Sequence, residues 1–347
     1  SQKQGKAFVV RQRCRTRNNR CRATHPEQTQ KPLKRRDRNE APDRVGQHHR
    51  SDRTNINQGR NRRAEGYHLY PPKRIEMEML SADESVQSFE EVAKGYSIEQ
   101  AKKEADRCVE CGICVATCPA LMDVPDYIRS IRERDYEKGL QLMYRTNPFP
   151  ATCGRICTRR CESVCPVGIQ GDPIAIRWLK RFIVDQVAPE DYTRILADQP
   201  GDSGHRVAII GAGPGGLSAA YYLRRKGHAV TVFESQAMAG GMLRYGVPSY
   251  RLPDEALDKD INYIQSLGVD IRFNTRVGRD IQFSELLDGY DAVFISTGLS
   301  LPSSMRIQGE DNPRVLSGLQ VLDDVASGRD PGIGRQVAVI GGGNVAM

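Results

Sequence analysis

The sequence has no long hydrophobic run and few aromatic side chains. No segment approaches the roughly 18 apolar residues that a membrane-spanning helix requires, so we expect a soluble protein without a membrane span. Aromatic residues make up only 6% of the chain. Leu, Ile, Val and Phe are scarce in the first 66 positions, where they are too few to offset the entropy lost on ordering the chain. We therefore expect a disordered tail at residues 1–75.

This N-terminal stretch also carries most of the positive charge. Residues 1–75 hold 21 Lys and Arg against 6 Asp and Glu, whereas all 347 residues together have a formal net charge of +8. A basic arm can bind nucleic acid or an anionic membrane by counterion release. This one lacks interleaved aromatic residues and an apolar face, so we predict neither partner. A native start at Met77 or Met79 is an alternative explanation of the tail.

The apolar pattern changes once after the tail. Ser81–Glu84 and Ser97–Gln100 have the capping-box pattern that begins a helix, and we expect Val92 on the apolar face of the first of these helices. Residues 126–144 and 173–187 have the period of amphipathic helices, with Tyr127, Ile128, Ile131 and Leu140 as expected core residues. From Arg206 onward, apolar runs of strand length alternate with helical segments, which is typical of a parallel sheet. The predicted divisions are the tail at 1–75, a small all-α domain at 76–198, an α/β Rossmann-type domain at 206–334 and the start of a second nucleotide-binding domain at 335–347.

Eight of the ten cysteines fall into two blocks of four. The first block has the spacing C-x2-C-x2-C-x3-C-P of bacterial ferredoxins, and the second has C-x3-C-x3-C-x3-C-P. Such spacing suits metal ligands in a cytoplasmic protein better than it suits disulfides. The members are Cys108, Cys111, Cys114 and Cys118 in the first block, and Cys153, Cys157, Cys161 and Cys165 in the second.

The ferredoxin spacing predicts how these thiols divide between two [4Fe-4S] clusters. Three closely spaced cysteines bind one cluster, and the fourth, beside the proline, binds the other. Two structural zinc sites or scattered buried thiols are alternatives, but zinc would favour two CxxC pairs and leaves both Cys-Pro steps unexplained. The predicted ligand sets are Cys108, Cys111, Cys114 and Cys165 for one cluster, and Cys118, Cys153, Cys157 and Cys161 for the other.

Residues 207–216 (VAIIGAGPGG) have the fingerprint of a dinucleotide-binding turn. Gly211 permits the tight turn, Gly213 lets a pyrophosphate approach the helix N-terminus, and Gly216 lets the helix pack closely on the strand. Glu234, at the end of the next strand, can accept hydrogen bonds from a ribose. A plain α/β turn is the alternative.

A second glycine-rich turn follows near the end of the sequence. Residues 335–347 repeat the strand and turn, with Gly341 and Gly343 in the fingerprint positions. We expect a second nucleotide site in a longer parent protein, in which the remaining helix and acidic residue would follow Met347.

With these motifs in this order, residues 75–347 resemble the small (beta) subunit of glutamate synthase and its relatives. The resemblance implies FAD at the first turn and NAD(P)H at the second. It also implies FAD contacts from Gly241, Met242, Leu243, Arg244 and Gly298, for which ordinary loop structure is the alternative. The motifs that carry it are PFPATCGRIC (148–157), DPIAIRWLKRF (172–182), VAIIGAGPGGLSAAYYL (207–223), GGMLRYGVPSYRLP (240–253) and STG (296–298).

Two departures from the family pattern concern the clusters. The first block has two residues between its second and third cysteines, where the glutamate synthase subunit has more, which favours the broader group of oxidoreductase relatives. Some relatives use Gln or Glu as a cluster ligand where this chain has Lys180. A cation cannot ligate iron, so we expect Cys153 to complete the second set.

These patterns predict an iron–sulfur flavoprotein subunit that passes electrons between NAD(P)H, FAD and two [4Fe-4S] clusters. Flavin is needed because a nicotinamide moves two electrons together, whereas each cluster moves one. We expect a partner subunit or a ferredoxin-like acceptor within a hetero-oligomer, and we assign no catalytic acid, base or nucleophile. A non-catalytic electron-transfer or assembly subunit is one alternative, and a basic-tailed zinc protein that binds nucleic acid is the other.

Overall fold

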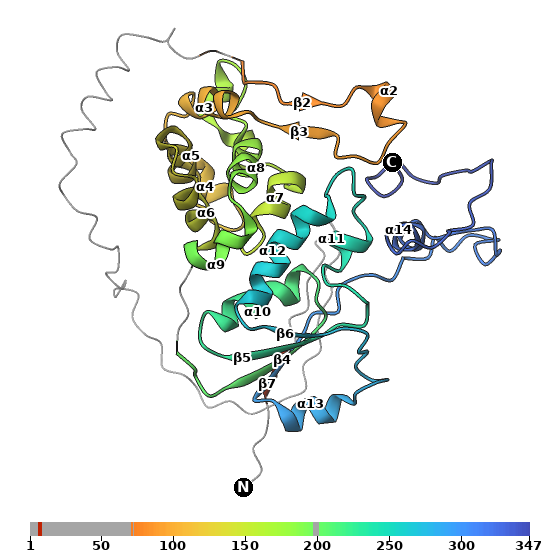
Figure 1. The fold of residues 1–347 in the computed structure, drawn as a ribbon. Coiled ribbons are helices and arrows are strands. Elements are labelled where there is room, and N and C mark those ends of the chain that lie inside the picture. Colours follow the sequence, from red (N-terminus) through yellow and green to blue (C-terminus); the bar gives the residue numbers. More distant parts are fainter. Residues whose placement is uncertain (1–5, 9–70, 72, 197–200) are drawn as a thin grey trace, which may run out of the picture. The chain divides into compact units, whose positions relative to one another are not determined.

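The computed structural model describes residues 6–8, 71, 73–196 and 201–347 (Figure 1). Most of the predicted tail lies outside these residues. Lys6–Phe8 forms strand β1, which pairs in parallel with a strand of the main sheet. The Ile75 amide donates to Glu104 at 2.8 Å, and Arg74 stacks on the ring of Trp178. At these positions the chain contacts the folded part, and disorder of residues 1–75 stays a prediction.

Two capping boxes begin the helical part, as the sequence predicts. The hydroxyls of Ser81 and Ser97 accept from the amides of Glu84 and Gln100, both at 3.2 Å. The helix after Ser81 is a single turn, and the strands before and after it form an antiparallel pair, so the all-α prediction was wrong here. The Val92 carbonyl accepts from Leu80, which holds this segment extended. The elements are β2 (Glu78–Met79), α2 (Ala82–Ser85), β3 (Ala93–Gly95) and α3 (Ile98–Asp106).

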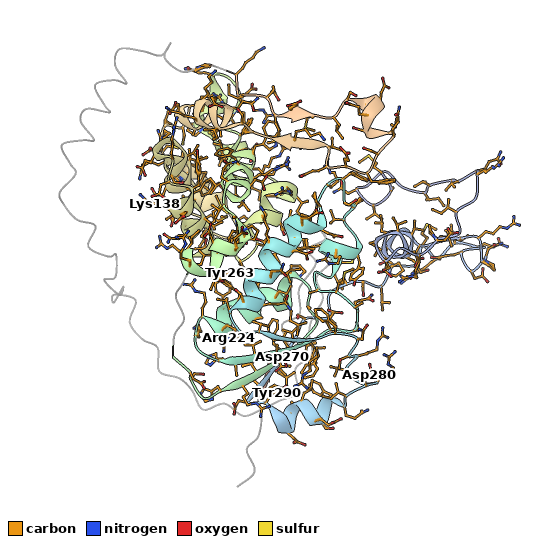
Figure 2. The ribbon with its side chains drawn as sticks, viewed as in Figure 1. Lys138, Arg224, Tyr263, Asp270, Asp280 and Tyr290 are labelled. Carbon is orange, nitrogen blue, oxygen red and sulfur yellow. The ribbon has the colours of Figure 1, made fainter. Side chains whose placement is uncertain are left out.

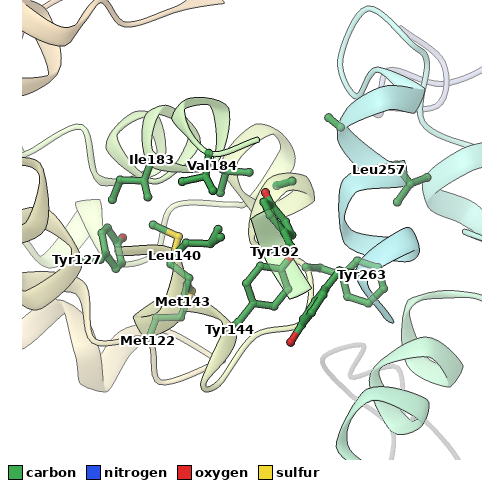
Figure 3. Close-up of a cluster of buried hydrophobic side chains, with 14 of the residues drawn as sticks. Met122, Tyr127, Leu140, Met143, Tyr144, Ile183, Val184, Tyr192, Leu257 and Tyr263 are labelled. Atoms are coloured by element: carbon green, nitrogen blue, oxygen red, sulfur yellow. The ribbon is translucent and has the colours of Figure 1, made fainter. Parts of the chain in front are cut away.

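The remaining helices of this part share one core. Tyr127, Ile128, Ile131 and Leu140, predicted as core residues, are each at most 1% exposed. In Figure 3 the side chains of Leu140 and Met143 lie beside Ile183 and Val184. The elements are α4 (Ile113–Thr117), α5 (Val124–Glu133), α6 (Tyr136–Tyr144), α7 (Pro150–Ile156), α8 (Ile176–Gln186) and α9 (Tyr192–Ile195), with 3-10 turns η1 (Glu162–Val164), η2 (Pro166–Ile169) and η3 (Pro189–Asp191).

A parallel sheet in the order β1-β7-β4-β5-β6 forms the second part (Figure 1). Ile209 of the central strand aligns with Val232 on one side and Phe294 on the other. Apolar strands covered by helices are typical of parallel sheets, and this arrangement confirms the predicted α/β, Rossmann-like class. The elements are β4 (Arg206–Ile210), α10 (Pro214–Arg224), β5 (Ala229–Phe233), α11 (Met242–Tyr245), α12 (Asp254–Ser266), β6 (Asp270–Arg272), α13 (Phe283–Gly289) and β7 (Ala292–Ile295).

The described chain after β7 has one helix, α14 (Gly318–Ala326). Residues 336–340, predicted as a strand, have no regular secondary structure, and Val339 and Ile340 are exposed. That prediction was wrong, because a strand gains its hydrogen bonds from a neighbour and no described segment pairs with this one. Throughout the described ranges, every helix is too short or too polar to cross a bilayer.

Tyrosines join the helical part to the sheet part. The hydroxyls of Tyr221 and Tyr222 on α10 donate to the carbonyls of Tyr144 and Thr146, at 2.6 and 2.7 Å. Tyr144 also meets Tyr263 of α12 edge-on, with ring centroids 4.8 Å apart (Figure 3), and Figure 2 labels Tyr263 in the whole chain. These contacts bring α10, which begins at the predicted nucleotide turn, and α12 against the end of α6 and the residues that follow it.

Candidate functional site

Four cysteines from the two blocks line one pocket. Cys108 follows α3, Cys111 and Cys114 lie at the start of α4, and Cys165 lies between η1 and η2. The pocket encloses about 340 Å³ of space free of atoms, including the solvent at its mouth, and Val124, Ile128 and Ile174 form part of its apolar wall. Cys165 therefore joins the first block, although it lies 51 positions after Cys114. These are the four thiols that the ferredoxin spacing predicts for one cluster.

The loop that carries Cys108 and Cys111 is fixed to α5 by a carboxylate. Glu110 has a left-handed backbone (φ 54°), and its side chain binds Arg129 at 2.5 Å and also Arg132. The following Gly112 (φ 79°) begins α4 without a side-chain cap. These turns direct three thiols of the first block toward one pocket.

The members of the second predicted set lie on α7 and at the ends of α4 and η1. This helix carries Cys153 and ends at Cys157, while Cys161 begins η1 and Cys118 ends α4. All eight described cysteines of the two blocks are free thiols. Among the described residues, no three His, Cys, Asp or Glu side chains lie close enough to share one metal ion. Gly154 lets α7 approach α8 directly, because a Cβ there would lie 2.9 Å from the Cα of Arg181.

Burial keeps several of these thiols protonated in the free protein. Burial raises the pKa of Cys114 to about 12, and the neighbouring Cys108 and Cys111 add to the effect. Burial raises the pKa of Cys161 to about 11, although the buried Lys180 cation opposes it. Since iron binds thiolates, binding of iron by these cysteines would release protons.

A buried hydroxyl lies among thiols of both sets. Tyr127 of α5 is fully buried, and its nearest ionisable neighbours include Cys161 and Cys114. Its hydroxyl neither donates a hydrogen bond to a described group nor accepts one from it. An unpaired buried hydroxyl is costly, and the sulfur atoms of an iron–sulfur cluster would provide an acceptor. The donor set and this hydroxyl together fit such a cluster.

The first glycine-rich turn fits a dinucleotide. Gly211 has φ 101°, and a Cβ at Gly216 would lie 1.9 Å from the Gly211 carbonyl oxygen, so both positions require glycine. Gly213 precedes α10, and no side chain caps this helix. The first amide groups of α10 are thus available for a phosphate. Glu234 is 7% exposed and accepts from the Ala212 amide at 2.7 Å, which holds its carboxylate beside the turn.

The segment 240–244 packs on this turn. The Gly240 amide donates to the Ala212 carbonyl at 2.8 Å, and Gly241 (φ 53°) lies against Gly213. Met242 and Leu243 follow as half-buried residues of α11. The chain that follows this segment reaches the helical part, since Tyr250 and Arg251 line a second pocket together with Gly154, Arg155 and Arg177.

Four other residues that were predicted as cofactor contacts are not packed on the first glycine turn in the same way. Arg244 is buried and pairs with Asp254 at 3.0 Å and with Asp258, so its guanidinium holds α11 to α12. Gly298 is an exposed residue after β7 (φ 73°). Gly341 and Gly343 are also exposed, on a turn whose preceding strand is not formed. A role in cofactor binding stays a prediction for all four.

Comparison with known proteins identifies both parts of the chain. Residues 85–192 match the family described as dihydropyrimidine dehydrogenase domain II, 4Fe-4S cluster, and residues 205–347 match pyridine nucleotide-disulphide oxidoreductases. The chain is 32% identical to the glutamate synthase [NADPH] small chain of Escherichia coli over 274 residues. The chain is a homologue of the glutamate synthase small chain. It is a relative of other oxidoreductase subunits as well.

Two of these oxidoreductase subunits are more similar in sequence. Identity is 42% to the beta subunit of NADP(+)-dependent formate dehydrogenase from Moorella thermoacetica and 37% to that of NADPH-Fe(3+) oxidoreductase from Geobacter sulfurreducens. Each match covers 67% of this chain but only 36% and 35% of the relative. The glutamate synthase match covers 75% of this chain and 58% of the relative.

Sequence reasoning missed one buried carboxylate in this glutamate synthase small-chain homologue. Asp260 of α12 is 0% exposed and accepts hydrogen bonds from the helical part. Burial raises its pKa to about 6, and hydrogen bonds from Thr152 and Ala151 oppose this shift. The available signal was its position, because it falls on the apolar face of α12 beside Leu257 and Ile264.

Proposed function

We propose that this chain is the iron–sulfur flavoprotein part of an NAD(P)H oxidoreductase, which transfers electrons to a partner subunit. The observation that carries the proposal is the pocket in which Cys165 joins Cys108, Cys111 and Cys114. The two matched families support it, since one is a 4Fe-4S domain and the other a pyridine nucleotide oxidoreductase domain. Relatives named as beta subunits or small chains support a partner.

Two sets of thiols would hold the clusters, one on Cys108, Cys111, Cys114 and Cys165, the other on Cys118, Cys153, Cys157 and Cys161. The first glycine turn, with Glu234 and the segment 241–244, would hold FAD. When bound, FAD accepts the two electrons of an NAD(P)H hydride and the clusters carry them one at a time. The chain binds and orients these groups, and no side chain is required to transfer a proton.

The fold favours an order for the two sets of thiols. Cys153 lies on α7, which packs against α12 and shares a pocket wall with Tyr250 and Arg251 of the motif 240–253, whose first residues pack on the glycine turn. Cys111 is exposed in the pocket of the first set. We therefore place the second set next to FAD and the first set next to the acceptor.

The full-length protein, purified without oxygen, tests this function. We expect about eight iron and about eight acid-labile sulfide atoms per chain, one FAD, and bleaching of the flavin by NADPH or NADH. Reduction should produce the electron paramagnetic resonance (EPR) signals of two interacting [4Fe-4S] clusters. Zinc without sulfide, or a flavin that neither nucleotide bleaches, would contradict the proposal.

The unpaired hydroxyl of Tyr127 gives a prediction about potential. In Tyr127→Phe, one cluster should become harder to reduce, by about 40–90 mV, because a hydrogen bond to sulfur worth about 1–2 kcal/mol is lost. Stability of the metal-free protein should not fall, since the hydroxyl is unpaired there. Redox titration followed by EPR measures the shift. Tyr192→Phe is the matched control, because its hydroxyl is also buried and unpaired but its ionisable neighbours are not cysteines.

Lys180 gives a second prediction of the same kind. Its buried cation lowers the pKa of Cys153 and Cys161 against the effect of burial, so it lies within electrostatic reach of the second set. Lys180→Met should make one cluster harder to reduce by about 50–100 mV, the Coulomb energy of one charge at an effective dielectric constant of about 20. Lys138→Met, on the exposed side of α6, should leave both potentials unchanged. Equal shifts in the two variants would contradict the assignment.

A further inference from the structure

The carboxylate of Asp260 connects the two parts of the chain. It belongs to α12 of the sheet part, is 0% exposed, and accepts four hydrogen bonds from residues more than 100 positions away in the sequence. One oxygen accepts from the Tyr144 hydroxyl at 2.9 Å and the Ala151 amide at 3.2 Å. The other accepts from the amide and the hydroxyl of Thr152, both at 2.9 Å.

These bonds complete the N-terminus of α7. The helix begins after Phe149, which provides no side-chain cap, and its first residue is Pro150, which has no amide hydrogen. The next two amides, of Ala151 and Thr152, both donate to Asp260, and the Cys153 amide donates within the helix to Phe149 at 2.9 Å. A side chain from another part of the chain therefore does what an N-cap residue normally does.

The position of α7 matters because of what it carries. Cys153 lies one residue beyond Thr152, and Cys157 ends the helix. α7 also packs closely against α8 at Gly154. The cap from Asp260 fixes the first turn of α7, and this contact fixes the turn that follows. Charge-assisted hydrogen bonds at a helix N-terminus are strong and directional.

We propose that Asp260 is a positioning residue through which the FAD-binding part holds the cysteine helix α7 and sets the geometry of the second cluster relative to the flavin. The inference rests on the proposed function. It assigns to α12 a role beyond packing. An apolar residue in place of Asp260 would fill the same space, but it would leave two helix amides and the hydroxyls of Thr152 and Tyr144 without an acceptor.

The variant Asp260→Asn tests this role in the full-length protein purified without oxygen. It keeps the shape of the side chain but replaces one acceptor oxygen by a donor. We expect FAD and the first cluster to be retained, the EPR signal of the second cluster to change, and amide hydrogen exchange in residues 151–157 to become about tenfold faster. Electron transfer from flavin to cluster should slow by about tenfold. Asp260→Glu, which restores a carboxylate, should recover part of each effect.

Glu255→Gln is the matched control, because it makes the same chemical change at an exposed position of α12. Should Asp260→Asn fail to fold, Thr152→Val removes one donor and keeps the helix amide, and the same local changes are expected at smaller size. An EPR signal identical to that of Glu255→Gln, or faster exchange spread evenly over the chain, would overturn the inference. Wild-type protein without iron would overturn the proposed function as well, whereas an unchanged EPR signal of the second cluster in every variant, beside a wild type that holds both clusters, would overturn only this inference.

Discussion

Replacing Cys165 by alanine should remove one of two clusters, so that iron falls from about eight to about four atoms per chain. The reason is that Cys165 lines the pocket of Cys108, Cys111 and Cys114, although it belongs to the second block. The remaining cluster should keep its EPR signal, and FAD should stay bound. Iron, sulfide and flavin analysis of the purified variant measures the change.

Double variants separate the exchanged assignment from a block-by-block one. If Cys165 and Cys114 serve the same cluster, Cys114→Ala/Cys165→Ala should retain about four iron atoms, as each single variant does. Cys161→Ala/Cys165→Ala should then lose nearly all iron, since it damages both sets. The reverse pattern would show that each block binds its own cluster, and the proposed ligand sets would be wrong.

The sequence predicted the elements whose signals are local. Both capping boxes form at Ser81 and Ser97 as the pattern requires, because all their partners lie within three residues. The turn at Gly211–Gly216 likewise contains its own constraints, since the atom that excludes a Cβ at Gly216 is the Gly211 carbonyl oxygen. Short-range chemistry of this kind can be predicted from one sequence.

The predictions that failed depended on distant partners. Val92 was expected in a helix, but its backbone pairs with Leu80 and Tyr250, and no local pattern indicates this. Residues 336–340 have a clear strand pattern, yet a strand forms only where another strand accepts its hydrogen bonds. Asp260 is an intermediate case, since its place on an apolar helix face indicated a buried carboxylate but not its partners on α7.

The candidate site shows the same division. Cysteine spacing indicates ligands because three thiols within seven residues can surround one cluster, but the fourth ligand comes from 51 residues further along the chain. The ferredoxin rule, in which the cysteine beside the proline serves the other cluster, predicted Cys165 for this set, and the fold brings it into the pocket of the other three. Arg244 has a structural role that its motif did not indicate, because it holds α11 to α12 through Asp254 and Asp258, and its contact with FAD stays a prediction.

The glycines of the first turn give the other large expected effect. Gly213→Ala should reduce FAD content to less than about a tenth of the wild type, because its methyl group would occupy the approach of a pyrophosphate to α10. The protein itself tolerates this methyl group, since a Cβ at Gly213 would meet the Cα of Gly241 at an ordinary 3.8 Å. Fluorescence of released flavin measures the FAD content, and iron should stay at about eight atoms per chain.

Two other alanine variants are controls that separate a specific loss of FAD from a loss of stability. Gly289→Ala places a methyl group in open space at the end of α13 and should leave FAD content and thermal stability unchanged. Gly216→Ala forces a Cβ to within 1.9 Å of the Gly211 oxygen, so it should lose FAD and stability together. Gly213→Ala is therefore the decisive variant, because among the three it alone should lose FAD without losing stability. Full FAD content in that variant would mean that the pyrophosphate does not lie on α10.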